Sequence, residues 1–152
     1  MQRRATLSTL AAAICTLVLW SAAGCSARCE VHTVMGDVNP FGWLSERVIT
    51  FENRDTATLC DLALTLRCGS DLETGPLTLE IEFTAPDSTR FVERRTFALP
   101  HPVKPAATAA VVTLPYRRNV RFNRTGTYTI ALKPSHTVRG IEAAGFTFEN
   151  QR

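Results

Sequence analysis

The chain has 152 residues, of which 45% are hydrophobic and 20% charged, and its formal net charge is +3. This length accommodates one domain with a hydrophobic core of its own. Two basic residues, Arg3 and Arg4, lie in an N-terminal segment that we expect to be removed, which lowers the charge of the remainder to +1. A balance so close to neutral excludes the broad basic surface by which proteins bind nucleic acids.

The N-terminal segment, residues 1–24, has the order of features typical of a secretory signal peptide. Arg3 and Arg4 precede an uncharged, mostly apolar stretch of 16 residues, Ala5 to Trp20, and small residues follow it up to Gly24. A stable membrane-spanning helix, which is the alternative, needs roughly 20 apolar residues. We therefore predict that residues 1–24 are a lipoprotein signal peptide that is cleaved from the mature protein.

Cys25 directly follows the small residues, and the stretch Ala22–Cys25 resembles the lipobox of bacterial lipoproteins, in which the cysteine becomes the acylated first residue. Each buried methylene contributes about 0.8 kcal/mol, so several acyl chains together hold a protein firmly in a membrane. The sequence thus predicts a lipid anchor on Cys25. A lipid-anchored tether and loop over residues 25–45 and a β-sandwich domain over residues 46–152 are expected to follow.

Three further cysteines, Cys29, Cys60 and Cys68, remain in the predicted mature chain. Exported proteins form disulfides readily, but three cysteines cannot all pair within one chain. Cys60 and Cys68 lie on one predicted strand, roughly 26 Å apart, whereas a disulfide joins Cα atoms about 4.4–6.8 Å apart. We expect Cys60 and Cys68 to be small buried hydrophobic residues and Cys29 to be the free thiol.

Beyond residue 45, apolar and polar residues alternate over short segments, which is the period of half-buried β-strands. In the clearest segment Cys60, Leu62, Leu64, Leu66 and Cys68 share one face. Turns rich in Gly, Pro and Asp separate the segments, and no helical period is present. The pattern predicts an all-β fold, an antiparallel β-sandwich of seven or eight strands, with a closed β-barrel as the alternative. The predicted strands are 48–51, 60–68, 76–84, 90–99, 108–114, 119–122, 127–132 and 141–148.

Carboxylates and histidines give little indication of catalysis. Glu80 and Glu82 lie on one strand face roughly 7 Å apart, which is within the spacing of an inverting glycosidase. Alternating glutamates are equally the solvated face of a strand, which is the interpretation that we prefer. His32, His101 and His136 lie in unrelated segments, and none has a Cys or an acid at metal-ligand spacing. The sequence predicts no catalytic residue, no metal site and no cofactor.

Two groups of residues are candidate contacts for a ligand. The segment 116–124 carries four arginines among aromatic residues, and a regular strand would place Arg117 and Arg121 together on its outer face. In an exported protein such a face suits an anionic glycan or lipopolysaccharide, unless it is simply solvated. Phe41 and Trp43 are candidate aromatic contacts for a sugar or a partner. The alternative for Trp43 is that it plugs one end of the core.

The C-terminal stretch, residues 122–149, resembles the closing segment of the gliding-motility lipoproteins of the H type (GldH) from Bacteroidota. That family has a Gly, a Tyr two residues later, an alternating strand, and a Gly-Ile pair before a final strand that contains Gly. The corresponding residues here are Gly126, Tyr128, Gly140, Ile141 and Gly145. On physical grounds we expect structural roles for them: the glycines suit turns, bends or bulges, and the Tyr128 hydroxyl needs a buried partner.

The resemblance implies a membrane-anchored, non-enzymatic lipoprotein that docks onto other envelope proteins in a gliding or type IX secretion assembly. The residues after Cys25, Ser26 to Arg28, are not acidic, unlike the surface-export signal of such lipoproteins. We therefore expect an anchor in the outer membrane and a domain that faces the periplasm. The alternative is an envelope lipoprotein that binds a glycan through Phe41, Trp43, Arg117 and Arg121.

Two triplets resemble the short O-glycosylation motif of exported Bacteroidota proteins. They are Asp55-Thr56-Ala57 and Asp87-Ser88-Thr89, and both lie in predicted turns, where a glycan is readily accommodated. Thr56 and Ser88 are therefore candidate glycosylation sites.

Overall fold

The structure is a computed structural model of the chain, and it describes residues 31–100 and 109–151. The predicted signal peptide, the lipidation site Cys25, Cys29 and His101 lie outside the described residues. Within these two ranges no helix is long and apolar enough to cross a membrane.

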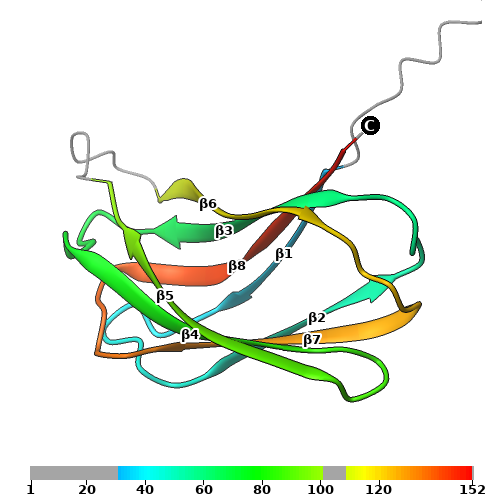
Figure 1. Cartoon of the computed structure of the whole chain (residues 1–152). Coiled ribbons are helices and arrows are strands. Elements are labelled where there is room, and N and C mark those ends of the chain that lie inside the picture. Colours follow the sequence, from blue (N-terminus) through cyan, green and yellow to red (C-terminus); the bar gives the residue numbers. More distant parts are fainter. Residues whose placement is uncertain (1–30, 101–108, 152) are drawn as a thin grey trace, which may run out of the picture.

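The described residues form eight strands in two four-stranded sheets, and every paired strand is antiparallel to its neighbour. Figure 1 shows the sheets as two layers, with the strand order β1-β8-β3-β6 in the first sheet and β2-β7-β4-β5 in the second. This arrangement confirms the predicted β-sandwich over the closed barrel. The strands are β1 Val31–Asp37, β2 Arg47–Asn53, β3 Cys60–Cys68, β4 Pro76–Thr84, β5 Arg90–Ala98, β6 Ala110–Val120, β7 Gly126–Pro134 and β8 Ile141–Asn150.

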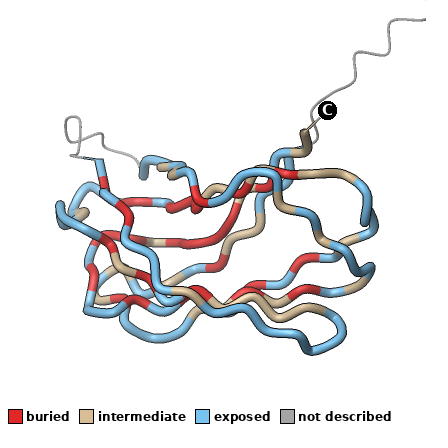
Figure 2. The backbone as a smooth tube through the Cα atoms, in the orientation of Figure 1, coloured by how far each residue is buried: buried red, intermediate tan, exposed pale blue. Residues whose placement is uncertain are grey.

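The core lies between the two sheets and follows the alternation of the sequence. Successive side chains of a strand point to opposite faces, so every second residue of β3, β4 and β7 is buried. Figure 2 shows the buried positions as short alternating segments along the strands. Cys60 and Cys68 are buried, as predicted, and both carry free thiols. The other main contributors are Leu62, Leu64, Leu66, Leu77, Leu79, Ile81, Tyr128, Ile130, Leu132, Ile141 and Phe146.

The strand β1 corrects the prediction that residues 25–45 are a tether and a loop. Its side chains are mostly exposed or half-buried, so the segment lacks the alternation that predicts the other strands. It is a strand because it pairs with β8 along its whole length, at the edge of the first sheet. A Cβ atom at Gly145 would collide with the carbonyl oxygen of Val34, so a glycine in β8 is what lets β1 approach. The sandwich therefore includes residues 31–37.

The strand β6 corrects a second boundary. The sequence predicts separate strands at 108–114 and 119–122, whereas the structure has one edge strand that runs through Pro115. Proline lacks an N–H group and is tolerated in an edge strand, which needs a hydrogen-bonded partner on one side only. The register with β3 shifts on both sides of Leu62, and β6 ends at Val120, so that Arg121 and Phe122 lie beyond it.

The two ends of the sandwich differ. At the open end lie the start of β1, the end of β8 and the connections 54–59, 85–89 and 121–125 (Figure 1). At the closed end lie the connections 38–46, 69–75 and 135–140. Trp43 is 0% exposed there, and its backbone exchanges hydrogen bonds of 2.8 and 3.0 Å with Val138. Trp43 therefore plugs the closed end of the core, as the alternative interpretation predicted.

Candidate functional site

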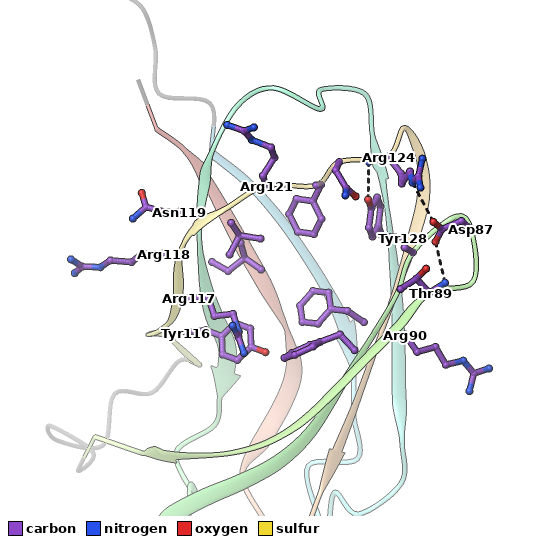
Figure 3. Close-up of a pocket in the computed structure, with 17 residues that line it drawn as sticks. Asp87, Thr89, Arg90, Tyr116, Arg117, Arg118, Asn119, Arg121, Arg124 and Tyr128 are labelled. Carbon is purple, nitrogen blue, oxygen red and sulfur yellow. Dashed lines mark hydrogen bonds and ion pairs between the residues drawn. The ribbon is translucent and has the colours of Figure 1, made fainter.

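A cleft of about 730 Å³ lies between the two sheets at the open end. It is bordered by β3, by the hairpin of β4 and β5, and by β6 with the connection that follows it (Figure 3). This volume is within the range of roughly 300–1,000 Å³ that small-molecule sites occupy. The cleft is therefore large enough to hold an organic ligand rather than a few water molecules.

The floor of the cleft is apolar and largely aromatic. The Phe83 and Tyr116 rings stack with centroids 6.2 Å apart, and the Phe122 and Tyr128 rings meet edge to face at 5.0 Å. Leu62 from β3 completes this surface. These five side chains are buried or half-buried in the protein, and we call them the aromatic floor.

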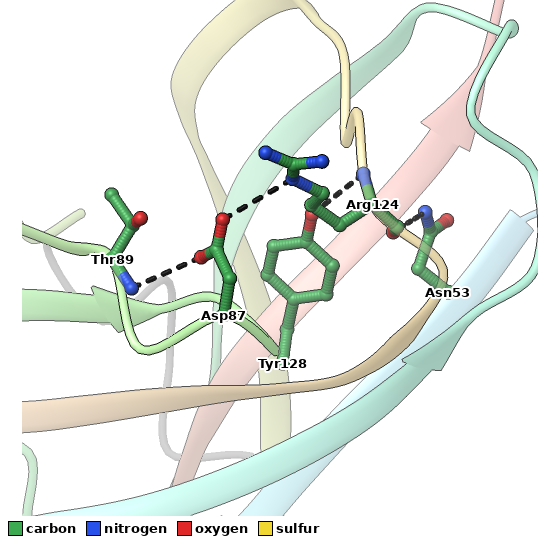
Figure 4. Close-up of polar contacts among 5 residues, drawn as sticks. All are labelled: Asn53, Asp87, Thr89, Arg124 and Tyr128. Carbon is green, nitrogen blue, oxygen red and sulfur yellow. Dashed lines mark hydrogen bonds and ion pairs between the residues drawn. The ribbon is translucent and has the colours of Figure 1, made fainter.

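Two tyrosine hydroxyls of the floor have different surroundings. The Tyr128 hydroxyl accepts a hydrogen bond of 3.2 Å from the backbone N–H of Arg124, which is the buried partner that the sequence predicts (Figure 4). The Tyr116 hydroxyl makes no hydrogen bond of good geometry, although the Glu93 carboxylate and the Arg117 guanidinium lie beside it. Burial raises the pKa of Tyr116, and Glu93 raises it further, so this hydroxyl stays neutral at physiological pH.

Arg117 joins the edge strands β5 and β6 across the cleft. Its Nε and Nη2 donate to the two carboxylate oxygens of Glu93, at 3.3 and 2.7 Å. Its guanidinium lies 4.7 Å from the centroid of the Phe91 ring and 5.6 Å from that of Tyr116. Burial alone would raise the pKa of Glu93, but the hydrogen bonds from Arg117 hold it below its ordinary value. The pair is thus ionised, and the position of Arg117 is fixed by two bonds and two rings.

The rim of the cleft is strongly basic. The described residues that line it include five arginines, Arg90, Arg117, Arg118, Arg121 and Arg124, and one carboxylate, Asp87. Arg124 pairs with Asp87 at 3.2 Å (Figure 4), Arg90 with Glu82 at 3.5 Å, and Arg117 with Glu93.

Arg118 and Arg121 make no ion pair with any residue that the structure describes. Both side chains extend away from the aromatic floor (Figure 3). The mouth of the cleft therefore carries two uncompensated positive charges.

The structure corrects the prediction that Arg117 and Arg121 share the outer face of a regular strand. Asn119 has a φ of +56°, and its backbone N–H donates to Asp61 Oδ1 at 2.9 Å, so the alternation of β6 is broken before Arg121. Both arginines line the cleft instead, Arg117 across it and Arg121 on the rim. Arg118 and Arg124 belong to the same arginine-rich segment of the sequence. Arg90 and Asp87 also line the cleft, but they come from the β4–β5 hairpin, and the sequence does not show that this hairpin lies beside the segment.

Phe41 and Trp43 do not join this site. Trp43 is fully buried and presents no ring face to a sugar, so its candidacy as a ligand contact is wrong. Phe41 is 81% exposed, but it lies at the closed end, on the opposite side of the sandwich from the cleft. The four predicted contact residues therefore separate into two cleft residues, one surface residue and one core residue.

The candidate glycosylation sites lie in exposed turns at the open end. Asp55 Oδ1 accepts from the backbone N–H groups of Ala57 and Thr58, at 2.8 and 3.1 Å. A side-chain hydrogen bond from Thr58 and these backbone bonds lower the pKa of Asp55. Asp87 likewise accepts from the backbone N–H of Thr89 at 3.0 Å, and this bond lowers its pKa. Thr56 and Ser88 lie between these residues and are exposed; their glycosylation stays a prediction.

The other polar candidates have structural surroundings. Glu80 and Glu82 pair with Arg94 and Arg90 at 3.5 Å each, as expected of the polar face of a strand. His32 and His136 are both exposed. Within residues 31–100 and 109–151 no group of three or more His, Cys, Asp or Glu residues is placed to hold a metal ion.

The residues that resemble the GldH-type pattern have structural roles. Gly126 and Gly140 have φ values of +122° and +78°, in the region that favours glycine, as the sequence predicts for turns. A Cβ atom at Gly140 would collide with the backbone of Leu72, so the closed end requires a glycine there. Ile141 is fully buried. Gly126 and Tyr128 lie beside the cleft, whereas Gly140 and Ile141 seal the closed end.

Comparisons with known proteins add little to this geometry. No protein-family model matches the chain, and no curated protein matches it in sequence. Among solved structures, the fold is similar to a carbohydrate-binding module described as specific for non-crystalline cellulose, CBM28. The superposition has a TM-score of 0.36 and a sequence identity of 10%, and it covers 80% of this chain and 71% of that one. A similarity of this degree carries no argument about the function of the chain.

Proposed function

We propose that this protein is a non-catalytic envelope lipoprotein whose sandwich binds an acidic glycan in the cleft. The observation that carries the proposal is the pair of uncompensated arginines, Arg118 and Arg121, on the rim of a cleft with an aromatic floor. A guanidinium binds a carboxylate or a phosphate through two parallel hydrogen bonds, and such charge-assisted bonds are about twice as strong as neutral ones. Aromatic rings supply the apolar surface on which a sugar ring can stack.

The fixed residues of the cleft support the same ligand. Arg117 is held by Glu93 and lies over Phe91, so little side-chain freedom is lost when a ligand contacts it. Phe91 lines the cleft and is 45% exposed, so part of its ring is available to a ligand. The cleft thus combines an ordered wall with two free cations, an arrangement that selects acidic over neutral sugars.

A direct test is to measure the affinity of the mature chain from Ser26 for acidic and neutral oligosaccharides by calorimetry. This chain contains every described strand and the whole core. We expect binding to carboxylated or phosphorylated oligosaccharides that weakens as salt is added, because the rim charges are exposed to solvent. The double variant Arg118→Gln/Arg121→Gln should bind at least about tenfold more weakly, the loss of one or more charge-assisted hydrogen bonds.

The control is Arg139→Gln, which makes the same type of substitution once at the closed end, where Arg139 lies 4.0 Å from Glu73. This variant should bind as the unmodified chain does. Equal affinity for neutral and acidic oligosaccharides, or an equal loss of affinity in the double variant and in the control, would show that the rim arginines do not recognise the ligand.

A second proposal keeps the docking role that the resemblance to GldH-type lipoproteins implies, in an outer-membrane protein that faces the periplasm. Its support is the exposure of three large apolar side chains close together in the sequence, Phe41, Leu44 and Val48. Exposed apolar side chains that gather on a surface mark protein contacts. They belong to the closed end and to the adjoining edge strand β2, so docking there leaves the cleft free.

The docking proposal is tested by co-purification from gently solubilised native membranes. We expect envelope proteins to accompany the unmodified protein and to be lost from Phe41→Ser/Leu44→Ser. The variant Cys25→Ser should leave washed membranes altogether, because no acyl chain then holds it. A Cys25→Ser protein that stays bound through several washes would contradict the anchor, and recovery of the unmodified protein alone would contradict docking.

A further inference from the structure

The start of the sandwich and the cleft lie at the same end of the molecule. Across the first sheet Val31 pairs with Glu149, Glu149 pairs with Asp61, and Asp61 accepts a hydrogen bond from Asn119. Neighbouring strands lie about 4.8 Å apart, so about 14 Å separates Val31 from the cleft residue Asn119 across these strands. Figure 1 shows the same arrangement, with β1 beginning at the open end.

The distance from the predicted anchor to the sandwich is short. Six residues lead from Cys25 to Val31, and a fully extended chain of this length spans at most about 20 Å. A nine-residue strand such as β4 adds about 30 Å between the open end and the closed end. An acylated Cys25 therefore keeps the open end, with its cleft, close to the membrane, whereas the closed end is free to lie about 30 Å farther away.

We propose that the ligand of the cleft is an acidic glycolipid of the membrane that carries the anchor. Its charged headgroup lies against Arg118 and Arg121, and one of its acyl chains lies on the aromatic floor. This inference rests on the proposed function, since the headgroup is the acidic glycan proposed there. The inference adds that the ligand also carries an acyl chain and that it comes from the membrane.

The charge and the polarity of the cleft match such a molecule. A free acidic sugar would satisfy the rim and stack on part of the floor, but its hydroxyl groups would leave the rest of this apolar surface, to which the half-buried Phe83 and Phe122 contribute, uncovered. A neutral lipid would cover the floor but would leave the positive charges of the rim uncompensated. A glycolipid whose acidic headgroup lies outside its acyl chains satisfies both parts, because the floor lies between the sheets and Arg118 and Arg121 extend outward from the β6 side of the cleft (Figure 3).

The test uses the mature chain from Ser26 and three probes. They are vesicles of phosphatidylcholine with lipid A, vesicles of phosphatidylcholine with phosphatidylglycerol, and the deacylated disaccharide bisphosphate of lipid A in solution. We expect the chain to sediment with the first vesicles and to bind the deacylated headgroup at least about tenfold more weakly, because the floor is then unused. Binding to the phosphatidylglycerol vesicles should be weak.

Two variants separate the two halves of the site. Ala85→Phe adds a large apolar side chain to the lining of the cleft from the β4–β5 hairpin and removes no arginine, and it should weaken binding to lipid A vesicles while leaving headgroup binding unchanged. Arg118→Gln/Arg121→Gln should weaken both, and Arg139→Gln should weaken neither. If the headgroup binds as tightly as the vesicles and Ala85→Phe has no effect, the glycolipid inference is overturned while the proposed function stands. Binding to no probe, or equally to both acidic vesicles, also overturns the glycolipid inference, and the oligosaccharide calorimetry then decides the proposed function by itself.

A second measurement does not depend on Ala85→Phe folding. The lipidated mature protein is reconstituted in vesicles that contain brominated phosphatidylcholine, which quenches nearby tryptophan. We expect the fluorescence of the closed-end residue Trp43 to be unaffected, and Phe91→Trp at the mouth of the cleft to add emission that is quenched. Quenching of Trp43 as strong as that at position 91 would show that the open end does not face the membrane and would overturn the inference.

Discussion

The two ends of this sandwich have similar elements, but one end is closed and the other contains a cleft. Each end has short connections between antiparallel strands, and each borders the same core. At the closed end Trp43 fills the space between the sheets, and Gly140 lets its turn lie directly against the backbone of Leu72. At the open end the corresponding space is left as a cleft, spanned by the Arg117–Glu93 pair.

The difference shows what it takes to close a sandwich at its end. At the closed end, a large apolar side chain that fills the space and a glycine that allows close backbone packing are enough to exclude solvent. At the other end charged side chains occupy the connections, and an arginine keeps its charge at the surface even when its stem packs on rings. An end that carries several arginines therefore stays open to solvent and to ligands.

The largest effect should come from removing the plug of the closed end. Trp43→Ala is expected to lower the free energy of unfolding by about 3–5 kcal/mol, as is usual when a buried aromatic residue is truncated. Phe41→Ala, two residues earlier, should change it by less than about 0.5 kcal/mol because that ring is exposed. Urea denaturation of the two variants measures both values. A small loss for Trp43→Ala would mean that the closed end is no better packed than the open one.

The next effect concerns the glycines of the two ends. Gly140→Ala should cost about 3 kcal/mol, because a positive φ is combined with a collision against backbone that cannot move aside. Gly126→Ala, at the open end, should cost about 1–2 kcal/mol, because its φ of +122° strains an alanine but its Cβ would meet only the Pro86 side chain, at 3.2 Å. Thermal unfolding measures the loss of stability in each variant. Equal losses would contradict the proposal that the closed end is packed more tightly than the open end.

A smaller effect compares the two tyrosines within the open end. Tyr128→Phe should cost about 1 kcal/mol, the value of the hydrogen bond that the backbone N–H of Arg124 donates. Tyr116→Phe should cost less, because its hydroxyl makes no hydrogen bond of good geometry. Chemical denaturation distinguishes the two, and a larger loss for Tyr116→Phe would show that this hydroxyl is engaged by Glu93.

The smallest effect is seen in the two thiols, one at each end. Burial raises the pKa of Cys60 and of Cys68 from 9.0 to about 11, so both should resist alkylation at pH 8 in the folded protein. An unfolded chain releases these protons first, near pH 9, so the raised pKa values make stability fall as the pH rises from about 9 towards 11. Peptide mass spectrometry after brief alkylation should find Cys60 modified before Cys68, because Cys60 belongs to the open end. The reverse order would contradict the comparison.

Much of the fold is predictable from the sequence because it is encoded locally. The strict alternation of residues 60–68 and 76–84 is enough by itself to assign Leu64 and Leu79 to the core, where both are fully buried. Strand β1 is not predictable in this way, since it depends on a glycine in β8 more than a hundred residues away. Such a strand is defined by its pairing with another strand and has no alternation of apolar and polar residues in its own sequence.

The candidate site is predictable only in part. The arginine-rich segment marks Arg117 and Arg121, but a sequence does not show that Glu93 crosses from another sheet to hold Arg117. Trp43 illustrates the opposite difficulty, since a lone tryptophan suits a binding surface and a core plug equally well until its burial is known. Residue types indicate the chemistry of a site, and the pairing of distant strands decides which residues supply it.

The edge strand β6 has a consequence for behaviour at high surface density. The proposed lipid anchor would confine the protein to two dimensions, where copies collide often, and unpaired strand edges favour the stacking of copies into aggregates. Pro115 lacks the N–H that an added strand would need, and the edge strand β5 carries the charged residues Arg90, Arg94 and Arg95, which strand addition would have to desolvate. On the side of the cleft the sheets therefore resist extension by strand addition, and crowding does not turn the edge beside the cleft into an aggregation edge.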